Sequence, residues 1–359
     1  MHNKKLIVVL GMHRSGTSAI TRGLKVLGVN LGDNLMPALK DNNDKGFWED
    51  IDFNELNIEM LKAIGQEWHY LTPVDQQDVE LLNTNGFAAR ALALLQEKIT
   101  DNAAFGLKDP RTAKLMPFWK NVFRQCDCDV SYILMVRHPI SVEKSLEKLY
   151  AFDAAKSYLL WLDHVLSSLV ESSGDTRVLV DYDYLMQRPV DELIRIGKSL
   201  GYEVDEREMD IYKTEFLEED LRHTVFELAD LQSQKACHAL VKDVYSVLVD
   251  MVENNAALDH VDRLVMNWKV EHEKLKPLLM LADRLYMQSQ LLHEKTEKLE
   301  NLVSQKDSEL VELNQQIGQL QTQNNSLNTQ IEQLNQDRSD AEDELDALDE
   351  IKQRRDSGM

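Results

Sequence analysis

Cysteine and long apolar runs are both scarce in this chain of 359 residues. The three cysteines, Cys126, Cys128 and Cys237, are few and odd in number, so we expect reduced thiols rather than a disulfide framework. No second Cys/His pair at zinc-like spacing accompanies them, which argues against a structural metal. No apolar run is long enough to be a signal peptide or to cross a membrane, which predicts a cytoplasmic protein without a membrane span.

Positive charge is also in short supply. The chain has 40 Lys and Arg residues against 62 Asp and Glu residues, a formal net charge of −22. Such a surface repels nucleic acid and anionic lipid, so neither is an expected partner. Residues 291–359 contain 16 acidic and 7 basic residues, so the rest of the chain is less anionic than the whole. An anionic ligand would need a local cationic site.

Short apolar runs alternate with helical patterns in the first 225 residues. The runs that predict buried strands are Leu6–Leu10, Tyr132–Val136 and Arg177–Val180. The helical patterns start at Thr17, cover Phe53–Ile64 and Ile140–Leu149, and cover Val190–Leu200 with Gly201 as the stop. This alternation predicts an α/β fold with a mostly parallel sheet flanked by helices. Ligands of such sheets bind at the carboxyl ends of the strands.

From about residue 226 onward the sequence has a helical pattern, and a heptad register follows. Positions a are Val303, Leu310, Ile317, Asn324, Ile331, Arg338 and Leu345, and positions d are Leu299, Lys306, Leu313, Leu320, Leu327, Leu334, Ala341 and Leu348. Branched aliphatic residues sustained over about seven heptads predict a long coiled coil. Asn324 at an a position favours a parallel, two-stranded coil.

These patterns divide the chain into three parts. We expect a ligand-binding domain in residues 1–225, a helical extension in residues 226–290 and the coiled coil in residues 291–355. The coiled coil predicts a homo-oligomer, with a dimer favoured. The alternatives are pairing with another coiled-coil protein, a long single helix, or a disordered polar tail.

The loop after the first predicted strand carries the strongest motif. It reads Gly11-Met12-His13-Arg14-Ser15-Gly16-Thr17-Ser18. Backbone N–H groups in such a loop converge on an anion, and the N-terminus of the next helix adds a positive dipole end. In the related Walker A loop, G-x-x-x-x-G-K-S/T, a lysine stands where this chain has Thr17, and the cation here is Arg14. Because nucleoside triphosphatases need that lysine, the loop argues against ATP or GTP hydrolysis. An ordinary turn with incidental glycines is the alternative.

The segment Arg14–Ser18 resembles the first signature of the sulfotransferase family, Lys/Arg-Ser/Thr-Gly-Ser/Thr-Ser/Thr between a strand and a helix. In that family the loop wraps the 5′-phosphosulfate of 3′-phosphoadenosine 5′-phosphosulfate (PAPS). The second signature is an arginine at a strand end and a serine eight residues later, both on the 3′-phosphate, and Arg137 and Ser145 match it. The resemblance covers roughly residues 5–225, and its first loop looks like that of the bacterial branch.

The resemblance implies a P-loop-like fold, PAPS as donor without a metal, and a set of site residues. The residues implied in donor binding are His13, Arg14, Ser15, Gly16, Thr17, Ser18, Arg137 and Ser145, with His13 expected to act through its backbone. Arg14 is expected to stabilise the transferring group and the leaving phosphate. Lys108, in Lys108-Asp109-Pro110-Arg111, would add a second cation, although an ion pair with Asp109 is the alternative.

The expected reaction moves a sulfuryl group from PAPS to a hydroxyl or amine acceptor, with a carbohydrate or another metabolite favoured. Glu49 matches a glutamate that serves as base in some relatives, with Asp50 in reserve; a loop carboxylate without a catalytic role is the alternative. Arg222 and His223 could reach the nucleotide or the acceptor. Two other functions stay open at this stage: a P-loop kinase-like phosphotransferase, and a scaffold protein with a degenerate nucleotide-binding domain.

Overall fold

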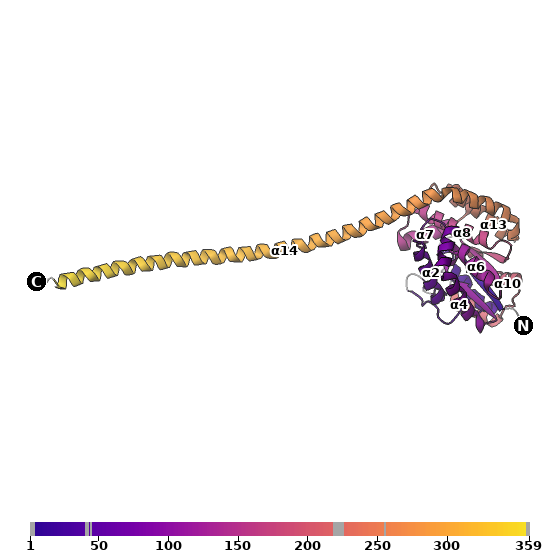
Figure 1. The fold of residues 1–359 in the computed structure, drawn as a ribbon, viewed down its shortest axis with the longest axis horizontal. Helices are drawn as coiled ribbons and strands as arrows, with labels where there is room; N and C mark the ends of the chain where they lie inside the picture. Colours follow the sequence, from indigo (N-terminus) through magenta and orange to yellow (C-terminus); the bar gives the residue numbers. More distant parts are fainter. Residues whose placement is uncertain (1–3, 40–42, 44, 218–225, 255, 357–359) are drawn as a thin grey trace. The chain divides into compact units, whose positions relative to one another are not determined.

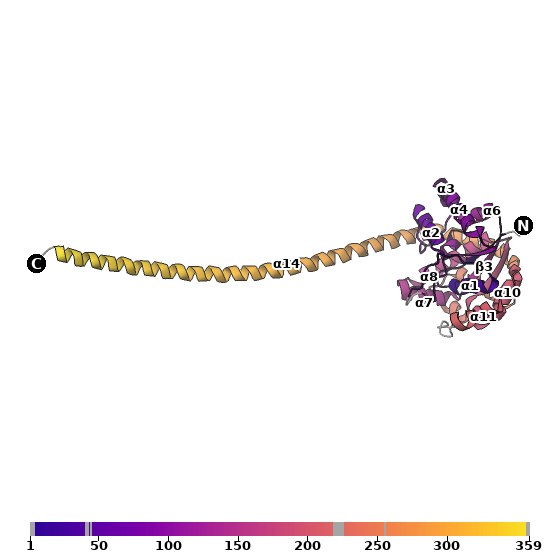
Figure 2. The same ribbon diagram turned by 90° about the horizontal axis from the view of Figure 1, so that it is seen from below.

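The computed structural model describes residues 4–39, 43, 45–217, 226–254 and 256–356. It divides into two compact units, Met1–Arg284 and Leu285–Met359, and each is described by itself. Figures 1 and 2 show the first unit as a layered α/β body and the second as one helix.

A four-stranded parallel sheet forms the middle layer of the first unit. The strands are β1 (Lys4–Leu10), β2 (Ala104–Lys108), β3 (Cys128–Val136) and β4 (Thr176–Asp181), in the order β2-β1-β3-β4. Strand β1 pairs with β2 and β3, and Leu10 lies opposite Leu134 at the end of the β1–β3 ladder. The continuous apolar runs are explained by burial on both faces. The predicted mostly parallel sheet flanked by helices is confirmed.

Helices cover both faces of this sheet, and each face has its own hydrophobic core. In β1 the side chains alternate: Leu6 and Val8 enter one core, and Ile7 and Val9 enter the other. One group of helices packs in the first core and a second group in the other, and Figure 2 shows members of the two groups on opposite sides of β3. The first group includes α2 (Ile51–Ala63), α4 (Phe87–Thr100), α6 (Met116–Gln125), α8 (Ala154–Glu171) and α13 (Ala239–Glu253). The second includes α1 (Thr17–Gly23), α10 (Pro189–Leu200) and α11 (Glu206–Ile211).

The first unit has further helices. They are η1 (Leu24–Leu27), α3 (Gln76–Thr84), α5 (Pro110–Lys114), α7 (Pro139–Tyr150), α9 (Tyr182–Gln187), the π-helix η2 (Tyr212–Phe216), α12 (Leu228–Ser233) and η4 (Leu258–Val261). Gly201 ends α10 in the left-handed region, at φ +72°, as its position in the sequence predicted. The three predicted strands occur as β1, β3 and β4, whereas β2 was not predicted.

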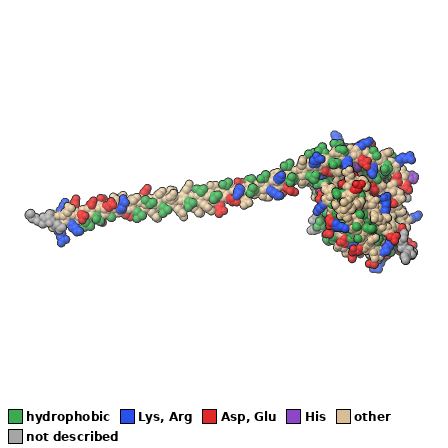
Figure 3. Space-filling model, viewed as in Figure 1, with side chains coloured by type: hydrophobic (Ala, Val, Ile, Leu, Met, Phe, Trp, Pro, Cys, Tyr) green, Lys and Arg blue, Asp and Glu red, His purple; other side chains and the backbone are tan. Residues whose placement is uncertain are grey.

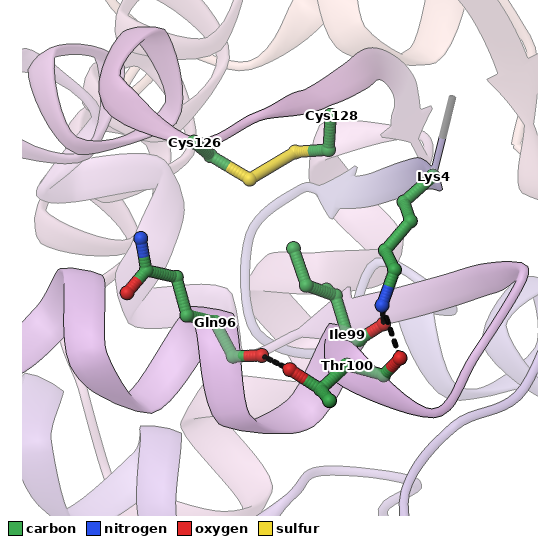
Figure 4. The surroundings of a disulfide bond; sticks show 6 residues. All are labelled: Lys4, Gln96, Ile99, Thr100, Cys126 and Cys128. Atoms are coloured by element: carbon green, nitrogen blue, oxygen red, sulfur yellow. Dashed lines mark hydrogen bonds between the residues drawn. A yellow bond between two sulfur atoms is a disulfide. The ribbon is translucent and has the colours of Figure 1, made fainter. Parts of the chain in front are cut away.

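Cys126 and Cys128 form a disulfide, so the prediction of reduced thiols is wrong for this pair (Figure 4). The bridge joins the end of α6 to the start of β3, where the two Cα atoms lie 5.4 Å apart, a separation that a disulfide can span. The odd cysteine count argued against a framework of several bridges, and it did not exclude one bridge between near neighbours. Cys237 is a free, buried thiol, as predicted.

One helix, α14 (Asp262–Asp356), contains the whole predicted heptad register. Its first turns belong to the first unit, where Val265, Trp268 and Leu279 are buried in the core. In the second unit the aliphatic residues of the register are between 50% and 66% exposed, and Figure 3 shows hydrophobic side chains along this helix. None of the helices in the described residues has both the length and the apolar character needed to cross a membrane.

Candidate anion-binding site at the strand ends

The two signature segments lie at the carboxyl ends of neighbouring strands. The loop of residues 11–16 follows β1, and Arg137 follows β3. All seven residues of β1 pair with residues of β3. Strand β2 lies on one side of β1, and β3 and β4 lie on the other, so the strand order reverses between β1 and β3. Such a switch point is where open α/β sheets bind their ligands.

The loop of residues 11–16 turns sharply through two left-handed residues. Arg14 has φ +68° and Gly16 has φ +84°. A Cβ atom on Gly16 would stand 2.1 Å from Cδ2 of Tyr182, so this position has room for glycine alone. Arg14 is not a glycine, and its conformation costs about 1–3 kcal/mol, which neighbouring contacts must offset.

Those contacts come from the second signature. The Nε of Arg14 donates a hydrogen bond to Oγ of Ser145, on α7, at 2.9 Å. The Nη1 of Arg137 donates to the carbonyl oxygen of Arg14 at 3.1 Å, and its guanidinium lies 4.3 Å from the centre of the Tyr182 ring. The structure therefore brings Arg14, Arg137 and Ser145 into one cluster, although Arg14 is more than 120 residues away from the other two in the sequence.

The electrostatics of this cluster favour an anion. Burial lowers the pKa of Arg14, and the positive charge of Arg137 lowers it further, while Tyr150 acts in the opposite direction. The guanidinium of Arg14 nevertheless keeps its positive charge at neutral pH, since the ordinary pKa of an arginine lies far above that pH. Two cations held side by side repel each other, and a bound anion would relieve that repulsion.

Buried polar atoms without a hydrogen-bond partner among the described residues include Oγ of Ser15, in the loop, and Nε of Arg137, in the cluster. Buried polar groups are nearly always hydrogen-bonded, so an unsatisfied pair at a strand end suggests a ligand position. Within the described part of the chain no side chain caps the N-terminus of α1, which leaves its first backbone N–H groups facing the same loop.

A second group, Glu49 and Lys108, lies beside the loop. The Nζ of Lys108, at the end of β2, donates to Oε1 of Glu49 at 2.6 Å and to the carbonyl oxygen of Phe47 at 2.8 Å. It also lies 3.4 Å from Oγ of Ser18, which connects this group to the loop. Both side chains are buried. Asn54 donates to the other oxygen of Glu49 at 3.0 Å.

Burial raises the pKa of Glu49, although the charge of Lys108 acts against this shift. A buried carboxylate held by one lysine and one amide has a defined orientation and a basicity above that of a solvated one. The neighbouring Asp50 instead caps α2 through the backbone N–H of Asp52 and forms an ion pair with Lys98 at 2.8 Å. The two candidate bases thus differ in their partners.

His13 packs its ring against Trp68, with 4.2 Å between ring centres. Burial lowers the pKa of His13 well below its usual value, and the charge of Arg111 lowers it further. A neutral imidazole adds no positive charge to the loop. Ser18 donates to the carbonyl oxygen of Phe47 at 3.0 Å, and Thr17 is buried at the start of α1.

The structure adds residues that the sequence analysis did not place in the site. Tyr182 contacts both Arg137 and Gly16, and Nη1 of Arg111 lies 4.0 Å from Oε2 of Glu49. Tyr182 comes two residues after the predicted strand Arg177–Val180, and Arg111 lies in the same short segment as Lys108; these positions were the available signals. Arg222 and His223 lie outside the described residues. Among the residues that the structure describes, no three His, Cys, Asp or Glu side chains form a group that could hold a metal.

Solved structures to which this chain is similar include two sulfotransferase domains. The sulfotransferase domain from the Synechococcus PCC 7002 olefin synthase is 17% identical, with a TM-score of 0.38, over 68% of this chain and 96% of that domain. The sulfotransferase domain from the curacin biosynthetic pathway is 18% identical, with a TM-score of 0.35, over 58% of this chain and 77% of that one. No family model and no curated sequence matches the chain. At such identities the activity has to be argued from this chain's own residues.

Proposed function

We propose that this protein is a sulfotransferase that uses PAPS as its sulfuryl donor. The observation that carries the proposal is the hydrogen-bonded cluster of Arg14, Arg137 and Ser145 at the adjacent ends of β1 and β3. One arginine belongs to the loop expected at the 5′-phosphosulfate, and the other stands where the 3′-phosphate is expected. A ligand with anionic groups at both ends of one nucleoside matches two cations on neighbouring strands.

The unsatisfied donors support this assignment of the donor. Oγ of Ser15 and Nε of Arg137 are buried, and each would gain an acceptor from a phosphate or sulfate oxygen. The backbone N–H groups of residues 16–18 add further donors at the start of α1. In this proposal Ser15–Ser18 hold the 5′ end of the nucleotide, and Arg137 and Ser145 hold the 3′-phosphate.

The transfer step is an in-line displacement at sulfur. The acceptor oxygen or nitrogen forms a bond to sulfur while the bond from sulfur to the bridging phosphate oxygen breaks, and the electron pair of that bond stays on the phosphate. Arg14 and Lys108 would stabilise the charge that develops on the leaving phosphate and on the sulfuryl oxygens. A positioned donor of this kind is worth about 3 kcal/mol. The second product is adenosine 3′,5′-bisphosphate (PAP).

Glu49 would take the proton that the acceptor loses. Its carboxylate is buried and fixed by Lys108 and Asn54, and its raised pKa makes it a better base than a solvated glutamate. Lys108 touches both Glu49 and Ser18, so the proposed base lies next to the loop that holds the donor. We propose a carbohydrate or another hydroxyl-bearing metabolite as the acceptor.

Calorimetric titration of the full chain with PAP tests the proposal, because PAP carries both terminal phosphates and does not react. We expect a dissociation constant well below roughly 100 µM, corresponding to more than about 5 kcal/mol of binding free energy. ATP with Mg²⁺ serves as the comparison ligand. Binding of ATP but not of PAP would point to a kinase, and binding of neither nucleotide would leave the scaffold function as the better description.

A further inference from the structure

The heptad register in α14 extends further upstream than Leu299. Leu278, Leu285 and Leu292 continue the d series at intervals of seven, and the three side chains are 65%, 56% and 63% exposed. The a position that follows each of them is small or polar: Ala282, Ser289 and Thr296. The apolar seam therefore starts at Leu278, on the segment of α14 that belongs to the first unit. Exposed leucines along one line of a helix need a partner surface.

Downstream of Leu299 three polar residues interrupt this seam, and each has a complement in a second copy of the chain. Asn324 occupies an a position and can pair with the same asparagine across a parallel, in-register coil. Lys306 occupies a d position, which in such a coil lies next to position e of the other chain, where Asp307 stands. Arg338 occupies an a position next to position g of the other chain, where Asp337 stands.

Within one chain, neither acid can be the main partner of its neighbour. Side chains at i and i+1 point about 100° apart on a helix and do not face each other. Lys306 instead forms an ion pair with Glu309 at 2.7 Å, and Arg338 lies 3.7 Å from Glu342. These partners are themselves at g and e positions, beside the seam, so both cations are held close to where a second chain would pack.

The residues that flank the middle of the seam also suit self-pairing. Across this stretch the e and g positions carry only uncharged amides: Asn314, Gln316, Gln321, Gln323, Asn328, Gln330 and Asn335. Two identical chains therefore bring no like charges together there. Like charges do meet near the C-terminus, where Glu342, Glu344 and Asp349 occupy flanking positions, so the last turns form the weakest part of the contact.

We infer that the exposed seam of α14, from Leu278 to Leu348, is the contact surface of a parallel, in-register dimer of this chain. An antiparallel pair would set the a position of Asn324 against a d position, most of which are leucine, and would separate Lys306 from Asp307 of the other chain. A different coiled-coil protein would have no reason to match all three polar residues at these positions. The inference does not depend on the proposed transferase activity.

Disulfide trapping tests the register directly. In a full chain with Cys237→Ser, we introduce Asn324→Cys at position a, or Thr329→Cys at the outward position f as the matched control. Mild oxidation should convert most of the Asn324→Cys chain to a covalent dimer on a denaturing gel, and little of the control. Equal trapping of the two variants, or none of the Asn324→Cys chain, would overturn the in-register arrangement.

Sedimentation equilibrium with charge exchanges tests the pairing across chains. Lys306→Asp should weaken the dimer about tenfold, because it places two acids opposite each other on each side of the seam. Adding Asp307→Lys should restore most of the affinity, whereas Glu309→Gln, which removes only the contact within one chain, should change it little. A monomeric wild-type chain at micromolar concentration, or no recovery in the double variant, contradicts the inference.

Discussion

Gly16 lies directly against the ring of Tyr182: a Cβ atom at this glycine would stand 2.1 Å from one ring carbon. We therefore predict that Gly16→Ala weakens PAP binding at least tenfold, because the loop must move away from Tyr182. Gly28→Ala is the matched control, since Gly28 also has a positive φ, +69°, but none of the atoms that the structure describes lies within 4 Å of its Cβ position. Both variants bear the backbone cost of about 1–2 kcal/mol, measurable by thermal unfolding. Equal PAP affinities in the two variants would show that the contact with Tyr182 does not shape the site.

Arg137→Ala should weaken PAP binding by roughly 10- to 100-fold, as expected for the loss of a hydrogen bond between charged groups. Calorimetry with PAP measures the change. Arg188→Ala provides the control, because Arg188 also stacks on a tyrosine ring, 4.9 Å from the centre of Tyr184, but is exposed. Equal losses in the two arginine variants would mean that PAP responds to overall charge and not to this site.

Glu49→Gln should lower the turnover number by about 10²- to 10⁴-fold while PAP affinity stays nearly the same. The wild-type rate should fall as the pH drops through the raised pKa of Glu49, because a protonated carboxyl cannot accept the proton of the acceptor. Glu49→Gln should lose this acidic limb. Rate measurements against pH with labelled PAPS check both statements, and a variant with unchanged turnover would remove Glu49 from the mechanism.

Asp181 caps α9, and ionisation of its buried carboxyl should make the protein less stable as the pH rises toward neutrality. Burial raises its pKa from 3.8 to about 7, while two backbone N–H groups, of Asp183 and Tyr184, act against that shift. The pKa of Asp181 is higher in the folded state than in the unfolded state. The stability that protonation of its carboxyl contributes is therefore fully present below the ordinary pKa of 3.8 and is lost as the pH rises through about 7. Asp181→Asn keeps the cap without the titration. Its melting temperature should therefore fall less than that of the wild type between about pH 5 and pH 7.5; parallel melting curves for both proteins would refute the assignment.

Deleting residues 291–359 should leave a soluble, folded first unit of lower oligomeric order. The buried residues at the start of α14, including Trp268 and Leu279, remain in the shortened chain, so the core keeps its last helix. Sedimentation velocity compares the two chains, and circular dichroism confirms that the shortened one is folded. An unchanged oligomer would place the main subunit contact elsewhere.

Local sequence patterns predicted most of the sheet but not its order. β1, β3 and β4 were predicted because their apolar runs are continuous, while β2 was missed because Ala104–Lys108 is short and includes Gly106. That glycine leaves room for a packed side chain, since a Cβ atom there would stand 2.8 Å from Cδ2 of Leu31. Such a requirement comes from a distant segment and leaves no local periodicity.

The candidate site shows the same division. Arg14 and Arg137 were placed at strand ends from the sequence, but their hydrogen bond depends on β1 and β3 being neighbours. The ion pair between Glu49 and Lys108 joins residues that are 59 positions apart, and no spacing rule connects them. The sequence thus predicted which residues stand at the strand ends, whereas it did not predict the contacts between distant segments.

The four strand ends also determine when this site can first exist during synthesis. Its parts follow β1, β2, β3 and β4 in turn, and the last of them, Tyr182, comes after Asp181 at the end of β4. Because all four strands are parallel, no local hairpin can assemble even half of the cluster. A nascent chain would therefore have to extend beyond residue 182 before it could bind a nucleotide at the complete site. Ligand binding by a ribosome-bound chain would show that all four strands had paired.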